Sequence, residues 1–213
     1  MTKILYQAQE NYLNQFLKQG DDLLSGMEEF ASRNNIPILS KPAADLLEQY
    51  VKLINPKRTL EIGTAIGYST IRIARNLKKK SKVFTIEKSE DNIKLAAENF
   101  SKSGNQEKIV LLEGDALNLM PRFDKKFDLI FLDADKEDYK RLFDYSVVLL
   151  KKGGILFIDN LLWHGYAASK SVPKKYKVST KLIREFNVLF TTAPNLFTTI
   201  LPVGDGIGIG IKV

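Results

Sequence analysis

The chain has 213 residues, with 32 Lys and Arg against 25 Asp and Glu, which gives a formal net charge of +7. This length suits one domain, 1–213, with a full core, and no apolar run approaches the roughly 20 residues that a membrane-spanning helix needs. Because there is no cysteine, disulfides, a thiolate metal site and a cysteine nucleophile are excluded. The first ten residues lack the apolar stretch of a signal peptide, so we expect a cytoplasmic protein.

The first predicted elements are helical. Residues 1–34 are expected to form a helical extension outside the core, with breaks near Gly20 and Gly26. Residues 41–54 are predicted to form a helix, which ends before a proline.

A glycine turn follows the first predicted strand, 58–62, and leads into a predicted helix, 69–79. Gly63 and Gly67 allow the backbone to turn tightly and to approach a ligand closely. The start of the helix offers unpaired N–H groups. The glycines are not spaced as in the G-x-G-x-x-G dinucleotide fingerprint, and no phosphate-binding lysine follows them.

Two further strands end in acidic residues. Strand 82–87 closes with Glu87, and an acid at this point of a nucleotide-binding unit can bind ribose hydroxyls. After a predicted helix, strand 109–113 is followed by Asp115 and Ala116. A glycine turn and two acids in this order favour a nucleotide-type cofactor. The helices here are expected at 89–103 and 116–121.

The most informative residues follow the next two strands. Strand 127–133 ends at Asp133, and strand 154–159 ends at Asp159 and Asn160. Neighbouring parallel strands would bring these three side chains to one edge of the sheet. Two carboxylates and a carboxamide suit Mg²⁺ or Ca²⁺ better than Zn²⁺.

Lys136 lies three residues after the first of these carboxylates, just before a predicted helix, 137–151. A nearby dication lowers the pKa of a lysine, so Lys136 is a candidate base. The alternative is a solvated lysine at the start of a helix.

The residues that follow the candidate metal ligands could contact a bound substrate. Trp163 could stack on a planar ring of the substrate. His164 is assigned no catalytic role, because a lone histidine is more often structural. Asp205 is interpreted as a hairpin-turn residue. A lysine cluster without acids, which includes Lys174 and Lys175, could guide a phosphate backbone or form a basic lid. The lysines are Lys170, Lys174, Lys175, Lys177 and Lys181.

The last predicted elements are a helix, 177–190, and two strands, 197–203 and 207–213. Alternating strands and helices predict an α/β fold: a mostly parallel seven-stranded sheet with helices on both faces. The last two strands are too close for a helical crossover, so the sheet should end in an antiparallel hairpin.

These motifs resemble a known family. The stretch from Glu61 to Ser69, the run Asp133-Ala-Asp-Lys136, the pair at 159–160 and the terminal Pro202-Val-Gly-Asp-Gly206 are similar to the Rossmann-like, cation-dependent O-methyltransferases of the catechol and caffeoyl-CoA type. Within that family the chain most resembles the bacterial tRNA 5-hydroxyuridine methyltransferases, which share the stretch Ile36-Pro-Ile-Leu39.

The resemblance implies a role for each matching residue. It implies S-adenosylmethionine as cofactor, Mg²⁺ or another hard cation as metal, and Lys136 as the catalytic residue. The implied metal ligands are Asp133, Asp159 and Asn160. The implied cofactor-binding residues are Leu39, Gly63, Ser69, Glu87, Asp115, Ala116 and Asp133.

The acceptor is left open between two classes. A chelating cation favours substrates with two adjacent oxygens, and both 5-hydroxyuridine and a small catechol have them. The basic cluster favours tRNA, with Trp163, Lys174 and Lys175 as candidate substrate contacts, and a small phenolic substrate is the alternative. The resemblance also implies a homodimer.

Overall fold

The computed structural model describes residues 5–17 and 21–213, and seven strands within these ranges form one sheet in the order β3-β2-β1-β4-β5-β7-β6. β1 to β5 pair in parallel, whereas β7 is antiparallel to both β5 and β6. The predicted mostly parallel sheet with a terminal antiparallel hairpin is therefore confirmed. The strands are β1 (Arg58–Ile62), β2 (Lys82–Glu87), β3 (Ile109–Glu113), β4 (Phe127–Leu132), β5 (Leu150–Ile158), β6 (Leu196–Leu201) and β7 (Ile207–Lys212).

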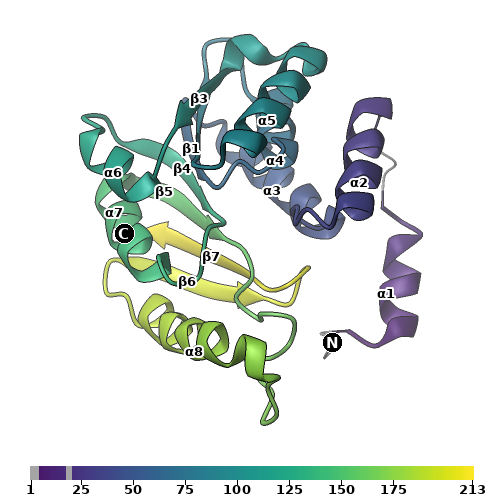
Figure 1. The fold of residues 1–213 in the computed structure, drawn as a ribbon. Helices are drawn as coiled ribbons and strands as arrows, with labels where there is room; N and C mark the ends of the chain where they lie inside the picture. The colour runs from purple at the N-terminus through teal and green to yellow at the C-terminus, as the bar shows by residue number, and fades with distance from the viewer. Residues whose placement is uncertain (1–4, 18–20) are drawn as a thin grey trace.

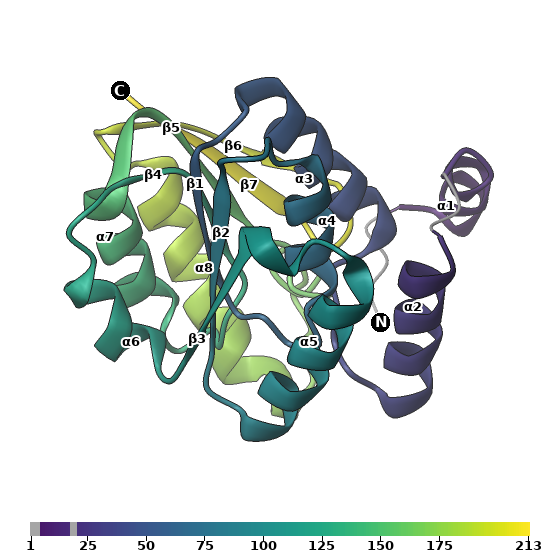
Figure 2. The same ribbon diagram turned by 90° about the horizontal axis from the view of Figure 1, so that it is seen from above.

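Helices cover both faces of the sheet (Figures 1 and 2). α3, α4 and α5 lie on one face and α7 and α8 on the other, while α1 and α2 lie outside the first layer (Figure 2). The helices are α1 (Gln7–Asn14), α2 (Asp22–Asn34), α3 (Lys41–Ile54), α4 (Tyr68–Asn76), α5 (Glu90–Ser103), α6 (Ala116–Leu119), α7 (Tyr139–Leu149) and α8 (Lys177–Thr191).

The alternation of side chains along β4 divides the core between the two faces. Leu129 and Phe131 pack with α3 and α4, whereas Ile130 and Leu132 pack with α7 and α8. All four are buried, because a parallel strand covered on both sides has no solvent-facing row.

The strand ends stay in register beyond the last paired residues. The N–H of Gly63 donates to Ile86 at 3.1 Å, and that of Asp133 donates to Ile62 at 3.0 Å. The N–H of Asp159 donates to Leu132 at 3.1 Å. These bonds hold the first residues after β1, β4 and β5 side by side at the carboxyl edge of the sheet, where such folds bind ligands.

The predicted boundary between helix 137–151 and strand 154–159 was wrong. α7 ends at Leu149, and β5 begins at Leu150, which is buried and pairs with Phe127. Burial of this leucine against the sheet outweighs the helical pattern that extends to position 151. β6 ends at Leu201, two residues before the predicted end at 203. The next residue, Pro202, has no N–H to donate to a neighbouring strand.

The N-terminal segment contains two described helices. The predicted break at Gly26 was wrong, because α2 continues through it and is capped by Asp21, which accepts the Leu24 N–H at 3.1 Å. The predicted break at Gly20 lies outside the described residues. α1 buries none of its residues, and both Tyr12 within it and Phe16 just after it are exposed. Within the described ranges, no helix is long and apolar enough to cross a membrane.

Candidate active site

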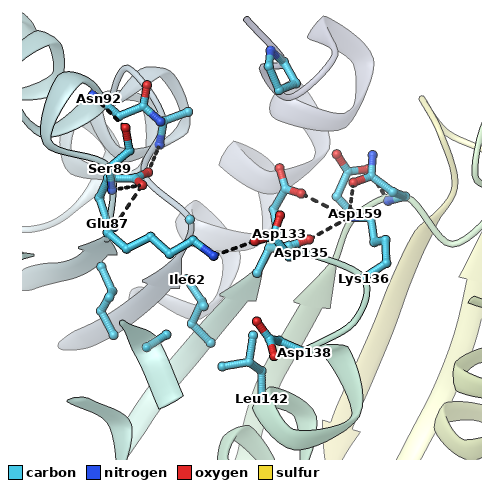
Figure 3. A pocket seen from close by; sticks show the side chains of 18 of the residues that line it. Ile62, Glu87, Ser89, Asn92, Asp133, Asp135, Lys136, Asp138, Leu142 and Asp159 are labelled. Atoms are coloured by element: carbon cyan, nitrogen blue, oxygen red, sulfur yellow. Dashed lines mark hydrogen bonds and ion pairs between the residues drawn. The ribbon is translucent and has the colours of Figure 1, made fainter. Parts of the chain in front are cut away.

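A cavity of about 500 Å³ opens at the carboxyl edge of the parallel strands. Figure 3 shows that Glu87, with Ser89 and Asn92, lies at one end and that Asp133, Lys136 and Asp159 lie together at the other. Nine residues singled out from the sequence line this cavity: Gly63, Glu87, Asp115, Ala116, Asp133, Lys136, Asp159, Asn160 and Trp163.

The Glu87 carboxylate is fixed by the backbone around it. One oxygen accepts the Ala65 N–H at 2.8 Å, and the other accepts the N–H groups of Lys88 and Ser89, both at 2.9 Å. The side chain is therefore pre-oriented at the end of β2, beside the glycine turn.

Gly63 lies where no side chain fits. Its backbone has a positive φ of 98°, and a Cβ built there would collide with the carbonyl oxygen of Asp133. The glycine thus allows the ends of β1 and β4 to approach closely. Asp115 caps the short helix α6 by accepting the Leu117 N–H at 2.8 Å, which places Ala116 at the cavity wall.

Two of the predicted cofactor residues lie beside the cavity rather than in its lining. Leu39 is 4% exposed and packs in the core with α3. Ser69, at the start of α4, donates its hydroxyl to buried Glu61 at 2.5 Å. Ser69 thereby ties the start of α4 to β1, on either side of the glycine turn.

Lys136 is the centre of the other end of the cavity. Its ammonium donates to the Asn160 Oδ1 at 2.7 Å and to the Tyr139 hydroxyl at 2.6 Å. It also lies 3.6 Å from Asp133 Oδ1. The Tyr139 hydroxyl in turn donates to the Asp159 carbonyl at 3.0 Å, so the lysine is tied to the ends of both β4 and β5.

Burial shifts the pKa values of this group of side chains. Desolvation lowers the pKa of Lys136 despite the opposing effect of the nearby carboxylates. Burial also raises the pKa of Asp133, and burial followed by the negative charge of Asp133 raises that of Asp159. Positive charge at this point would therefore stabilise the ionised carboxylates.

Trp163 and His164, which line the cavity, contact the rings of Tyr166 and Tyr176. The Trp163 indole N–H donates to Ser179 on α8 at 2.9 Å, and its ring lies 5.0 Å from that of His164. Tyr176 stacks on Tyr166 with ring centroids 5.1 Å apart. Lys175 lies over the Tyr176 ring at 4.7 Å, whereas Lys174, in the same single 3₁₀ turn, is exposed.

Comparisons with known proteins give the family. The O-methyltransferase family profile matches residues 17–213. The chain belongs to the O-methyltransferase family. A caffeoyl-CoA O-methyltransferase of Eucalyptus globulus is 35% identical over 181 residues, 81% of this chain and 74% of the relative.

Solved structures agree with this family. A candidate caffeoyl-CoA O-methyltransferase from Staphylococcus aureus has 31% identity and a TM-score of 0.90, covering 97% of this chain and 100% of that one. An O-methyltransferase from Bacillus cereus in complex with S-adenosylhomocysteine has 26% identity and a TM-score of 0.83, with 97% of each chain covered. The protein is thus an S-adenosylmethionine-dependent O-methyltransferase.

The sequence interpretation missed several residues that line this cavity or lie against its lining. His164, which it left out, lines the cavity, and Asp205, read as a turn residue, accepts the His164 N–H at 2.5 Å. Lys88 and Asp135, both in the cavity lining, form an ion pair at 2.6 Å. Only their positions in the sequence pointed to these residues. His164 and Lys88 directly follow Trp163 and Glu87, and Asp135 and Asp205 lie within motifs given above.

Proposed function

We propose that this O-methyltransferase uses Mg²⁺ and methylates the hydroxyl of 5-hydroxyuridine at the wobble position of tRNA, giving 5-methoxyuridine. The observation that carries the metal-dependent part is the meeting of Asp133, Asp159, Asn160 and Lys136 at two adjacent strand ends inside one cavity. The acceptor is supported by the sequence resemblance and by Tyr176, which contacts Trp163 and His164 of the lining and carries Lys175 over its ring.

The donor set fits a hard divalent cation. Asp133 and Asp159 would supply carboxylate oxygens and Asn160 an amide oxygen, the ligand types that Mg²⁺ prefers. Among the described residues no cluster of three or more His, Cys, Asp or Glu side chains has metal-site spacing. The Lys136 ammonium already lies among these oxygens, so this pocket accepts a cation. A bound dication would lower the pKa of the acceptor hydroxyl and fix its direction.

Lys136 is proposed as the group that takes the acceptor proton. Its Nζ is oriented by Tyr139 and Asn160, its side chain is 8% exposed, and burial lowers its pKa toward the range of a base. In the neutral form, Nζ would accept the proton of the acceptor hydroxyl.

The cofactor end has the features expected for a nucleoside. Glu87 is proposed to bind the ribose hydroxyls, and Gly63, Asp115 and Ala116 to border the rest of the cofactor, with Asp133 between cofactor and metal. S-adenosylmethionine would supply the methyl group. Leu39 and Ser69 are proposed to act at the edge of this end, Ser69 through its bond to Glu61.

A small catechol is the second candidate acceptor. It is favoured by the relatives, which are named for the small thioester caffeoyl-CoA. It needs the same metal and lysine chemistry but no lysine cluster. Trp163 would serve as a stacking wall for either ring.

The test offers both acceptors to the purified protein. Labelled S-adenosylmethionine and Mg²⁺ are incubated with tRNA that carries 5-hydroxyuridine, and in parallel with a simple catechol. We expect label in tRNA, at 5-methoxyuridine on nucleoside analysis. Label in the catechol alone would overturn the tRNA acceptor.

The metal role is tested with Asp159→Ala, and exposed Asp124→Ala is the matched control. Asp159→Ala should reduce methylation at least 100-fold while S-adenosylhomocysteine still binds. Methylation at the parent rate by Asp159→Ala would remove the metal role. The Asp124 variant should behave as the parent.

A further inference from the structure

The turn after β5 has an unusual backbone. Asn160, Trp163 and His164 all have positive φ angles, of 64°, 47° and 55°. L-residues rarely adopt this conformation, and they keep it only where the surroundings hold them. This turn carries one proposed metal ligand and two residues of the acceptor side of the cavity, so whatever holds it also positions the site.

The turn between β6 and β7 holds it. The N–H groups of Leu161 and Leu162 donate to the carbonyls of Gly206 and Asp205, both at 2.9 Å. The two turns touch so closely that a Cβ at Gly206 would lie 2.6 Å from the Leu162 nitrogen. The C-terminal hairpin therefore packs its backbone directly against the turn that carries the proposed metal ligand.

Asp205 adds a side-chain clamp to these backbone bonds. Its Oδ1 accepts the His164 N–H at 2.5 Å, and its Oδ2 lies 3.7 Å from the His164 Nδ1. The side chain is 19% exposed, and its carboxylate also interacts with the Asn160 side chain. A carboxylate needed only for the hairpin would bond within its own turn; this one bonds across to the other.

We propose that Asp205 is a positioning residue of the methyltransferase site. It fixes the left-handed turn through the His164 N–H and so sets the direction of the Asn160 amide and of the Trp163 and His164 rings toward the acceptor. This inference rests on the proposed function, which assigns Asn160 to the metal and Trp163 and His164 to the acceptor. It differs from a hairpin-only role, in which loss of the carboxylate would change stability alone.

The chain supplies its own probe of the turn, because Trp163 is its only tryptophan. In Asp205→Ala, without metal or acceptor, we expect the fluorescence of Trp163 to shift and its quenching by acrylamide to rise. Mg²⁺ affinity, measured by calorimetry with S-adenosylhomocysteine present, should fall roughly 10- to 100-fold, the usual effect of removing a partner of a metal ligand. The KM for the acceptor should rise, whereas S-adenosylhomocysteine affinity should stay at the parent value.

Asp205→Asn keeps an oxygen that can accept the His164 N–H, so it should return Mg²⁺ affinity to within about tenfold of the parent. Asp124→Ala, an exposed acid far along the chain from both turns, is the control for loss of one negative charge. It should leave all readouts unchanged.

The inference is overturned if Asp205→Ala keeps parental quenching and parental Mg²⁺ affinity. It is also overturned if both Asp205 variants lose S-adenosylhomocysteine affinity and thermal stability equally, because that result describes a folding residue. If the parent methylates neither acceptor, the proposed function fails. Quenching and Mg²⁺ affinity still decide the role of Asp205 in that case.

Discussion

Glu61 shows how a single buried residue supports the cofactor end. It is fully buried in β1 and accepts hydrogen bonds from the hydroxyls of Ser69, Thr70 and Thr85. These bonds tie the first turn of α4 and the neighbouring strand β2 to the strand before the glycine turn. These hydrogen bonds lower the pKa of Glu61, but burial has the larger effect and raises this pKa to about 7.

This shift predicts a pH dependence of stability. The folded state holds the Glu61 proton more tightly than the unfolded chain does, so stability falls as pH rises from about 4.5 to about 7. The full effect is about 3 kcal/mol. Urea unfolding between pH 4 and 8 should show this decline in the parent and a flatter profile in Glu61→Gln.

The control for that experiment is Glu113→Gln, which removes an exposed acid at the end of the neighbouring strand β3. It should keep the parental pH profile. Equal slopes in the parent and Glu61→Gln would contradict the prediction, because the titrating group would then lie elsewhere.

At the scale of elements, one arginine joins the helices of the first layer. Arg72 on α4 has an 8% exposed side chain and pairs with Asp45 and Glu48 on α3. It also donates to the Tyr68 hydroxyl at 2.9 Å, and that hydroxyl donates to Glu28 on α2 at 2.7 Å. The network therefore holds α2 and α3 against α4, the helix that begins at the glycine turn.

Arg72→Met should lower the free energy of unfolding by about 3 kcal/mol, because it leaves two carboxylates without their buried partner. Arg75→Met on the same helix is the matched control. Its pair with Asp21 is more exposed, so the loss should stay below about 1 kcal/mol. Denaturant titration measures both, and equal losses would show that the network adds nothing beyond a surface ion pair.

The elements differ in how far the sequence could predict them. β1, β2, β3 and α3 match their predicted bounds, because turn or cap residues flank each short apolar or amphipathic pattern. The α7–β5 boundary could not be read locally, since it depends on Leu150 meeting Phe127 across the sheet. Likewise, the strand-end acids were predictable from parallel pairing, whereas the Asp205–His164 contact joins two turns 41 residues apart and required the fold.

At the scale of the whole molecule, acids line the cavity at both ends, with Glu87 and Asp115 where the cofactor is proposed to bind and Asp133 and Asp159 at the other end. Beside Trp163, on the side proposed for the acceptor, Tyr176 and Ser179 belong to the lysine-containing 3₁₀ turn at 174–176 and to α8. A net charge of +7 with this distribution favours a polyanion arriving from the lysine side.

If those lysines contact phosphates, tRNA binding must weaken with salt. Each neutralised phosphate changes the slope of log affinity against log salt by about 0.7 to 0.9. Replacing Lys174 and Lys175 with Gln should therefore reduce the magnitude of the slope by about 1.4 to 1.8, while S-adenosylhomocysteine affinity stays constant. Fluorescence anisotropy with labelled tRNA at several salt concentrations measures this slope.

Lys79→Gln with Lys80→Gln provides the matched control, because these exposed lysines lie at the opposite, amino end of β2 and carry the same charge. A general attraction between a basic protein and RNA would respond equally to both double variants. A directed path to the cavity would respond only to the pair at 174–175. Equal slopes for the two variants would therefore leave the lysines beside the site as a basic lid and favour the small phenolic acceptor.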